Sequence, residues 1–329
     1  MSRIEVGILG AGRLAEVVVR LLSSGPGAKL SLWARNPEAL ARLRAVSPTL
    51  ETSQEIGAVT SKADVVLFAV PAGALEEVAD RYGPFARGDQ VVIHAARGVG
   101  EGFVLPHELI RRRSCVRKIV ALGGPLHARE IETGRPLAAV VASRFPRAIE
   151  AVRAMAHGTQ IRVHPSRDVV GVEVAGAIAN VSQLAAGISD GLDLGETARG
   201  TLLARGLTEA QRIGMALGGD PTTFLGLAGV GELIPRKVSS TSRHHELGVV
   251  LAKGVPLERA LPSGAAGVEG VAAALSISAL AKRKNLRLPL AETVEAILRG
   301  ERGASEAIQA LLRLDLEDFV MPRAMGQRP

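Results

Sequence analysis

The feature that most constrains this fold is an alternation of short apolar runs with segments of helical spacing in the first half of the chain. The apolar runs occupy residues 4–9, 63–70, 90–96, 118–124 and 137–143. Parallel strands that are covered by helices on both faces have this composition. Amphipathic segments such as 73–82 lie between the runs. The alternation therefore predicts a doubly wound α/β domain with a mostly parallel sheet.

The second half of the chain lacks strand patterns. From 168 to 315 helical segments follow one another, and 197–217 and 272–285 are examples. A chain of 329 residues is long for one hydrophobic core. The sequence therefore predicts a second domain that is built only of helices.

The boundary between the two domains is expected within 161–169. Pro165 and Ser166 can end a strand and begin a helix there. We therefore assign 1–165 to the α/β domain and 166–329 to the helical domain.

Composition excludes nucleic acid as an expected partner. The net charge is +7, but only 2% of the residues are aromatic, which leaves no platform for stacking bases. A modest positive field suits a small phosphorylated or otherwise anionic substrate and an anionic cofactor. These bulk properties favour a metabolic enzyme over a nucleic-acid-binding protein.

Several other classes of site lack their sequence signals. There is no uncharged apolar run of about 18 residues, so no membrane span is expected. The single cysteine, Cys115, fits a reducing cytoplasm. No H-E-x-x-H spacing or G-x-S-x-G turn occurs, so neither a metal site nor a serine hydrolase is predicted.

The segment "GILGAGRLA" carries a G-x-G-x-x-A fingerprint after the first apolar run and at the start of a helical pattern. Gly10 would allow a tight turn, and Gly12 would let the backbone approach a pyrophosphate. Ala15 would let the helix pack closely on the strand. The position of the motif predicts a Rossmann domain that binds a dinucleotide at a helix N-terminus.

The end of the second predicted strand, 28–35, bears on the choice between NAD and NADP. No acidic residue stands at its tip, where one would bind the ribose 2′-hydroxyl of NAD. Arg35 could stack on adenine, accept the 2′-phosphate of NADP, or be a plain surface arginine. Both cofactors therefore remain open. Pro71, which follows the next long strand, is placed to shape the loop on the nicotinamide side.

The chain resembles bacterial NAD(P)-dependent glycerol-3-phosphate dehydrogenases over nearly its whole length. The matching segments are "GAG", "WARNPE", "AVPAGAL", "GGPLHAREIETGRPLAAVVAS", "GVEVAGAIANVSQLAAGISDGLDLG", "ARGLTEAQRIGMALGG", "TFLGLAGVGEL", "SRHHELG" and "VEGV". The resemblance implies reduction of dihydroxyacetone phosphate to sn-glycerol 3-phosphate, a step in phospholipid precursor metabolism. It also implies a helical domain of the 6-phosphogluconate-dehydrogenase-like type, a cytoplasmic homodimer, and a substrate cleft between the two domains.

The resemblance carries cofactor and substrate roles onto many matching residues. On the cofactor side these are Gly10, Gly12, Arg35, Ala128 and Glu269. On the substrate side they are Gly124, Asn180, Ser242 and Arg243. Arg243 would clamp the substrate phosphate, a role that suits a guanidinium fork. Arg13 and Leu14 stand where the family has serine and tryptophan.

The catalytic side departs from the family. Arg97 replaces one lysine, and Ala179 replaces the lysine that protonates the carbonyl oxygen. Glu232 replaces an aspartate. A positioned acid typically contributes ~10²–10⁴-fold to such a step. Alanine cannot donate a proton, and arginine is a poor donor because its pKa exceeds ~12. Further replacements are Leu126 for serine, Arg236 for threonine and His244 for asparagine.

Three hypotheses follow from this degenerate active site. The first is a dehydrogenase for a different small anionic substrate, held by Arg97, Arg236 and Arg243. His244, Lys237 or Glu232 would then act as acid or base, and the neighbouring His245 adds an option, although the two histidines could simply face solvent. The second is a non-catalytic dinucleotide-binding sensor or partner protein. The third is a glycerol-3-phosphate dehydrogenase with low turnover.

Overall fold

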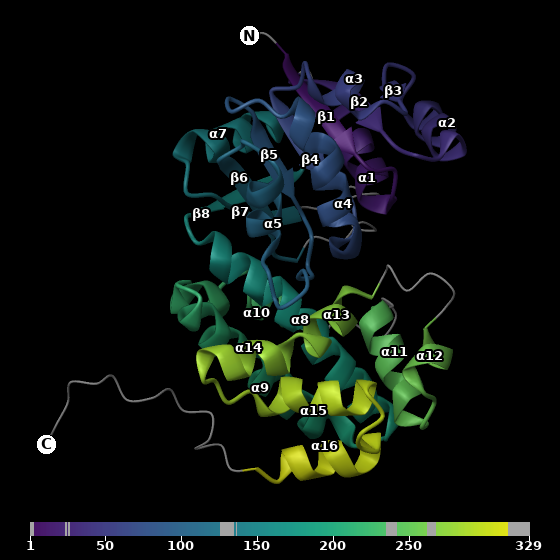
Figure 1. Cartoon of the computed structure of the whole chain (residues 1–329), viewed down its shortest axis with the longest axis vertical. Coiled ribbons are helices and arrows are strands. Elements are labelled where there is room, and N and C mark those ends of the chain that lie inside the picture. Colours follow the sequence, from purple (N-terminus) through teal and green to yellow (C-terminus); the bar gives the residue numbers. More distant parts are fainter. Residues whose placement is uncertain are drawn as a thin grey trace, which may run out of the picture.

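The computed structural model describes residues 3–23, 25, 27–125, 135, 137–234, 242–261 and 268–314. An α/β unit and a helical unit follow one another along the long axis of the molecule, with the α/β unit at the top of the view (Figure 1). The α/β unit contains one eight-stranded sheet of order β3-β2-β1-β4-β5-β6-β7-β8. The strands are β1 (Ile4–Leu9), β2 (Ala28–Trp33), β3 (Glu51–Ser53), β4 (Val65–Phe68), β5 (Val91–His94), β6 (Lys118–Gly123), β7 (Leu137–Ala142) and β8 (Ile161–Ser166).

The sheet confirms the predicted doubly wound, mostly parallel architecture. Every neighbouring pair of strands is parallel except β6 and β7, which are antiparallel. The helices between the strands are α1 (Arg13–Ser23), α2 (Pro37–Val46), α3 (Ile56–Thr60), α4 (Ala72–Tyr82), η1 (Gly83–Phe85), α5 (Pro106–Arg113) and α7 (Pro146–Met155).

The two faces of the sheet have separate apolar cores. Ile8 belongs to a cluster that includes residues of α1, α2 and α7, whereas its neighbour Leu9 belongs to one that includes residues of α3, α4 and α5. Successive side chains of a strand point to opposite faces, so both faces of β1 are buried. This burial explains why the strands read as continuous apolar runs.

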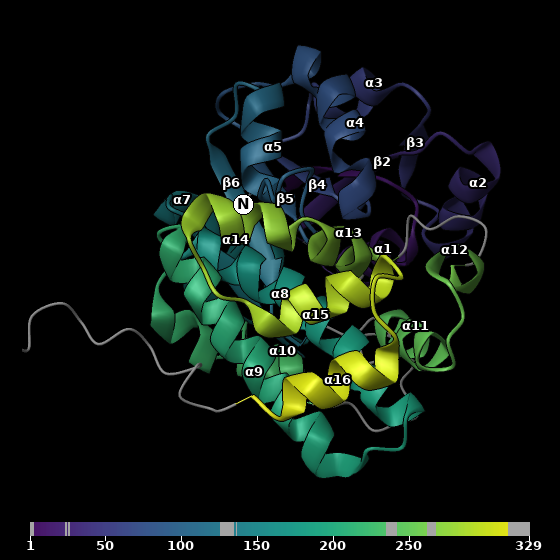
Figure 2. The ribbon, with the colours of Figure 1, turned by 60° about the horizontal axis from the view of Figure 1, so that its bottom comes forward.

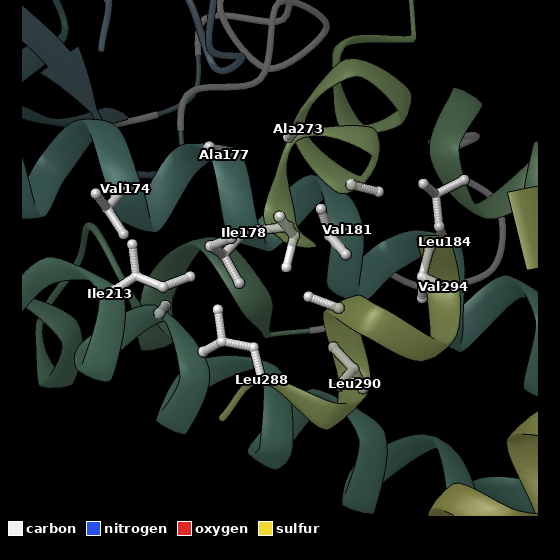
Figure 3. Packing of buried hydrophobic residues seen from close by; sticks show 14 of the residues in the cluster. Val174, Ala177, Ile178, Val181, Leu184, Ile213, Ala273, Leu288, Leu290 and Val294 are labelled. Carbon is white, nitrogen blue, oxygen red and sulfur yellow. The ribbon is translucent and has the colours of Figure 1, made fainter. Parts of the chain in front are cut away.

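The helical unit is assembled around α8 (Val169–Gly191). Its other helices are α9 (Gly195–Ala216), η2 (Pro221–Leu225), α10 (Val230–Leu233), α11 (Arg243–Ala252), α12 (Leu257–Ala260), α13 (Glu269–Leu275), α14 (Ile277–Lys284), α15 (Pro289–Leu298) and α16 (Ala304–Leu312). Figure 3 shows Val174, Ile178 and Val181 of α8 packed among Ile213, Leu288 and Leu290. Figures 1 and 2 show α8 and α13 reaching the border with the α/β unit.

Helix α8 is apolar on nearly all sides because it is the core of the helical unit. By length and composition alone it could cross a membrane, but 89% of its most apolar window is buried inside the protein. Asp168 caps its N-terminus and accepts a 2.8 Å hydrogen bond from the backbone N–H of Gly171. The high hydropathy of this helix therefore reflects burial in protein.

One predicted helix is divided in two. The sequence pattern predicts a single helix over 272–285, but α13 ends at Leu275 and α14 begins at Ile277. At the break, the carboxylate of Glu295 accepts hydrogen bonds from both the backbone N–H and the hydroxyl of Ser278. The prediction was wrong because the Glu295 side chain from α15 accepts the hydrogen bond of a backbone N–H that a carbonyl of the same helix would accept in a continuous helix.

Glu209 makes the stability of the helical unit depend on pH. Its buried carboxyl accepts hydrogen bonds from the backbone N–H groups of Leu290 and Ala291 at the start of α15. Burial outweighs these donors and raises the pKa of Glu209 from 4.5 to about 8. Because the folded pKa lies above the unfolded one, the carboxyl stabilises the fold below pH 4.5, and this contribution is lost as the pH rises through about 8.

We therefore expect the unfolding free energy of the wild type, relative to Glu209→Gln, to fall as the pH rises across that window. Urea denaturation of both proteins at about pH 5 and about pH 8.5 measures the difference. Glutamine is the matched reference because it has the same size and does not titrate. A difference that is the same at both pH values would contradict the assignment.

Candidate active site

The fingerprint loop has the geometry that close approach of a pyrophosphate requires. Gly10 adopts φ = 114°, and a Cβ on it would lie 2.6 Å from the carbonyl oxygen of Ala69, so only glycine fits. A Cβ on Gly12 would meet no described atom within 4 Å. Ala15 is fully buried where α1 packs on the sheet. The loop therefore leaves its outer side accessible directly before the N-terminus of α1.

Positive charge surrounds this loop. Arg13 is exposed at the start of α1, whereas Leu14 is half-buried and packs on the core beneath the helix. Arg42 of α2 donates a 2.9 Å hydrogen bond to the carbonyl of Ala11. Arg35 follows β2 and forms an ion pair with Glu77 of α4, with its own side chain 61% exposed. Arg35 is thus accessible beside the loop, and its geometry is compatible with either cofactor.

Glu269 links the helical unit to two loops of the α/β unit. It is the first residue of α13, and its Oε1 accepts a 2.6 Å hydrogen bond from the backbone N–H of Ala72. Pro71 caps the same end of α4. The other oxygen, Oε2, accepts a 3.2 Å hydrogen bond from the backbone N–H of Arg97. One carboxylate therefore holds together the loops that follow β4 and β5.

Arg97 contacts most of the other residues of the candidate site. Its guanidinium pairs with the carboxylate of Glu232 on α10 and donates a 3.1 Å hydrogen bond to the carbonyl of Gly124 after β6. Its own carbonyl accepts a 2.9 Å hydrogen bond from the side chain of Asn180 on α8. Four of the predicted site residues thus meet at the border of the two units.

Position 179, where the resemblance places the family lysine, is apolar in this chain. Ala179 is only 5% exposed and clusters with Ala186 of α8, Leu203 of α9 and Leu233 of α10. Its neighbour Asn180 lies on a different side of the helix, toward Arg97. Nothing at position 179 can therefore donate a proton, and leucine side chains pack around it.

His244 is not poised to act as an acid. Its Nε2 accepts a 3.0 Å hydrogen bond from the backbone N–H of Gly270, so that nitrogen is unprotonated. Burial lowers the pKa of His244 to about 4, and the charges of Arg97 and Arg243 act in the same direction. The ring is consequently neutral at physiological pH and fixes the start of α13.

His245 lies away from the Arg97 site. Its Nε2 is 2.8 Å from Asp190, which also pairs with Arg199. The alternative in which both histidines simply face solvent is therefore wrong, because each contacts a specific partner.

Ser242 caps α11, and Arg243 is its exposed first residue. Four positions discussed from the sequence lie outside the described residues: Leu126, Ala128, Arg236 and Lys237.

A buried acidic group with two histidines was not predicted from the sequence. Glu173 of α8 lies 2.8 Å from Nε2 of His94 at the end of β5 and 2.6 Å from Nδ1 of His107 in α5. His94 and Glu173 line a small cavity together with Arg97, Gly124 and Glu232. Two signals were available in the sequence: a polar residue at the end of an apolar strand, and a single acidic residue in the apolar stretch 169–181.

Comparisons with known proteins agree with this architecture. Residues 5–148 match the model for the NAD-dependent glycerol-3-phosphate dehydrogenase N-terminus, and 168–309 match the model for its C-terminus. The chain is 33% identical to the glycerol-3-phosphate dehydrogenase [NAD(P)+] of Bacillus subtilis, covering 96% of this chain and 97% of that protein. It is 34% identical to that of Synechococcus elongatus, covering 94% and 96%.

Solved structures give the same result. The crystal structure of glycerol-3-phosphate dehydrogenase from Coxiella burnetii superposes with a TM-score of 0.87 at 29% identity, covering 95% of this chain and 99% of that one. The resemblance that the sequence motifs indicated is thereby confirmed, as is the combination of a Rossmann domain with a helical C-terminal domain.

Proposed function

Since the chain belongs to the NAD-dependent glycerol-3-phosphate dehydrogenase family, we propose that it reduces dihydroxyacetone phosphate to sn-glycerol 3-phosphate with low turnover. The observation that carries this proposal is the convergence of Arg97, Glu232 and Asn180 at the border of the two units. The family is one of oxidoreductases that act on a CH–OH group and use NAD or NADP. The substitution at Ala179 is the reason to expect a slow reaction.

The residues of the fingerprint loop fit a dinucleotide. Gly10 forms a cradle that a Cβ would fill, and the start of α1 offers backbone N–H groups to a pyrophosphate. When bound, NADH or NADPH supplies the hydride. Arg35 would lie on the adenosine side, and Pro71 and Glu269 on the nicotinamide side. The two cofactors differ only at the 2′-position of the adenosine ribose, which Arg35 would approach, and Arg35 forms an ion pair with Glu77.

Arg97 is suited to stabilise the charge that hydride addition creates on the carbonyl oxygen. Hydrogen-bond donors held in place in a partly buried site act strongly on developing negative charge. The pairing with Glu232 and the bond to Gly124 fix the guanidinium. Arginine nevertheless keeps its own proton at neutral pH. The apolar surroundings of Ala179 therefore leave the family's proton donor without a replacement at that position.

The two other hypotheses remain as alternatives with distinct outcomes. A different small anionic substrate is favoured by the guanidinium fork that replaces a lysine at position 97. A non-catalytic dinucleotide-binding protein is favoured by the leucine cluster around Ala179. We also propose that the protein is a cytoplasmic homodimer, as the resemblance implies.

A substrate panel separates these hypotheses. Purified protein is incubated with NADH or NADPH and with dihydroxyacetone phosphate, its unphosphorylated form, or small 2-oxo acids, and products are identified by mass spectrometry. We expect sn-glycerol 3-phosphate from dihydroxyacetone phosphate alone. Faster oxidation of cofactor with a 2-oxo acid would favour the altered substrate. Binding of cofactor without any product would favour the non-catalytic protein.

Arg243→Ala is expected to weaken binding of dihydroxyacetone phosphate without changing the affinity for NADPH. The exposed guanidinium at the start of α11 would bind the substrate phosphate, and a hydrogen bond to a charged group is typically worth about 1.5–3 kcal/mol, or roughly 10- to 150-fold in affinity. Isothermal titration calorimetry with dihydroxyacetone phosphate, and separately with NADPH, measures the two affinities. The matched control is Arg162→Ala, an exposed arginine on β8. Equal affinity in the wild type and Arg243→Ala would place the phosphate site elsewhere.

A further inference from the structure

A carboxylate between two histidines lies directly behind the candidate active site. Glu173 is buried on α8, and His94 at the end of β5 is fully buried. Oε1 of Glu173 lies 2.8 Å from Nε2 of His94 and also accepts a 2.7 Å hydrogen bond from the backbone N–H of His107. Oε2 lies 2.6 Å from Nδ1 of His107, whose side chain is 15% exposed. Three side chains from β5, α5 and α8 thus form one chain of polar contacts.

Glu173 carries a negative charge in this arrangement. Burial opposes ionisation, but contacts with His107 and His94 lower the pKa of its carboxyl below the ordinary value. Burial likewise opposes the charge on His107, but Glu173 raises the pKa of that ring above its ordinary value. The buried carboxylate lies 2.8 Å from Nε2 of His94 and is placed to orient that ring, as in other carboxylate–histidine pairs.

Nδ1 of His94 has no polar partner among the residues that the structure describes. Among the same residues neither ring nitrogen makes a hydrogen bond of normal geometry, although Nε2 lies 2.8 Å from Oε1 of Glu173. Buried polar atoms without partners are uncommon and cost free energy. The ring lines the small cavity that Arg97, Gly124 and Glu232 also line. A ligand oxygen in this cavity would satisfy the free nitrogen and would lie beside the guanidinium of Arg97.

We propose that His94 donates the proton to the substrate oxygen in this chain, with Glu173 and His107 as positioning residues. This inference rests on the proposed function. As the hydride adds to the carbonyl carbon, the C=O π electrons move to oxygen. The oxygen then bonds to the proton of Nδ1, and the N–H bond breaks. His94 is left as neutral imidazole with Nε2–H toward Glu173, and water restores the proton after product release.

The other candidates for this role are excluded by their contacts. Ala179 is apolar, Arg97 stays ionised, and the Nε2 lone pair of His244 already accepts from Gly270. The charged and titratable groups facing His94 are Glu173 from α8, Arg97 after β5 and Glu232 from α10. His107 acts through Glu173.

The test compares wild type and His94→Gln for reduction of dihydroxyacetone phosphate between about pH 5.5 and 9, a range that brackets histidine titration. We expect kcat of the wild type to fall as the pH rises, because the protonated ring is the donor. His94→Gln should lower kcat by ~10²-fold, the lower end of the range for a positioned acid, and remove this dependence on pH. Affinity for NADPH should not change. An unaltered kcat and pH profile would overturn the proposal.

Two further experiments distinguish failure of this proposal from failure of the proposed function. In an Ala179→Lys background, which supplies a second acid, His94→Gln should lower kcat much less than it does in the wild type. If the wild type forms product and His94→Gln forms it at the same rate, the dehydrogenase assignment stands and the role of His94 falls. If the wild type forms no product, the proposed function and the role of His94 both fall.

A binding measurement needs no turnover. Addition of sn-glycerol 3-phosphate should shift the ¹⁵N signal of His94 Nδ1 in the wild type more than it shifts the signals of His164 on β8. An unperturbed His94 signal at a saturating concentration would contradict contact with the ligand, even if His94→Gln does not fold.

Discussion

Replacing Arg97 by methionine is expected to lower kcat for dihydroxyacetone phosphate by ~10²–10³-fold, the usual cost of removing one donor from developing charge on oxygen. Methionine keeps most of the length and flexibility of the side chain but has no donor. The backbone of residue 97 should keep its bonds to Glu269 and Asn180, since neither uses the side chain. The loop after β5 should therefore hold its position, and affinity for NADPH should change little.

Arg97→Lys is the matched variant for this experiment. It keeps the charge next to Glu232, but a single ammonium group cannot reproduce the planar fork that reaches both Glu232 and the carbonyl of Gly124. We expect an intermediate rate. Steady-state kinetics and NADPH fluorescence titration measure the two quantities separately. A methionine variant with at least half of the wild-type kcat would show that the guanidinium does not act on the reacting oxygen.

Ala179→Lys is expected to raise kcat by up to ~10²-fold, since a positioned acid typically contributes ~10²–10⁴-fold and His94 supplies only the lower part of that range. The new side chain would start beside Leu203 and Leu233 and would have to extend past them for its ammonium group to reach the cleft. Long lysine side chains can pack their methylene groups on apolar residues in this way.

The control is Ala179→Met, which adds similar length without charge. It should pack in the same apolar cluster and leave kcat near that of the wild type. Thermal unfolding of both variants shows whether either one disrupts the cluster. Equal kcat in the wild type and in a stably folded Ala179→Lys would mean that the missing lysine does not limit this enzyme.

Much of the fold follows from local sequence signals. Buried parallel strands must be apolar on both faces, so β4 and β5 appear as continuous runs. Glycine is required at position 10, where φ is positive and a carbonyl lies close, so the fingerprint correctly predicted the position of this loop. The break at Ser276 was not predictable in the same way, because it depends on Glu295 from another helix.

The connections of the candidate site are long-range, and the sequence does not encode them locally. Arg97 and Glu232 are 135 positions apart, and their pairing depends on how α10 packs at the border of the units. The substitution at Ala179 was visible in the sequence, but the leucines that surround it were not assigned to it. Their packing makes the surroundings of position 179 apolar.

The contacts of Glu173 are the clearest example of a site feature that was not predicted from the sequence. It is the one acidic residue in the segment "GVEVAGAIAN", and the motif comparison treated it only as part of a matching helix. Its partner His107 is 66 positions earlier, on a helix of the other unit. A lone acid in a buried helix needs partners, and that physical requirement is the signal that could have identified the pair.

The most direct test of the central claim is a single-turnover experiment with the wild type. Enzyme in excess of NADPH is mixed with dihydroxyacetone phosphate in a stopped-flow instrument, and loss of cofactor fluorescence is followed while the product is identified by NMR. We expect a slow single-exponential decay that yields stoichiometric sn-glycerol 3-phosphate. If both ligands bind and the cofactor signal stays constant, the chain does not catalyse this reaction, and the account of its active site is wrong.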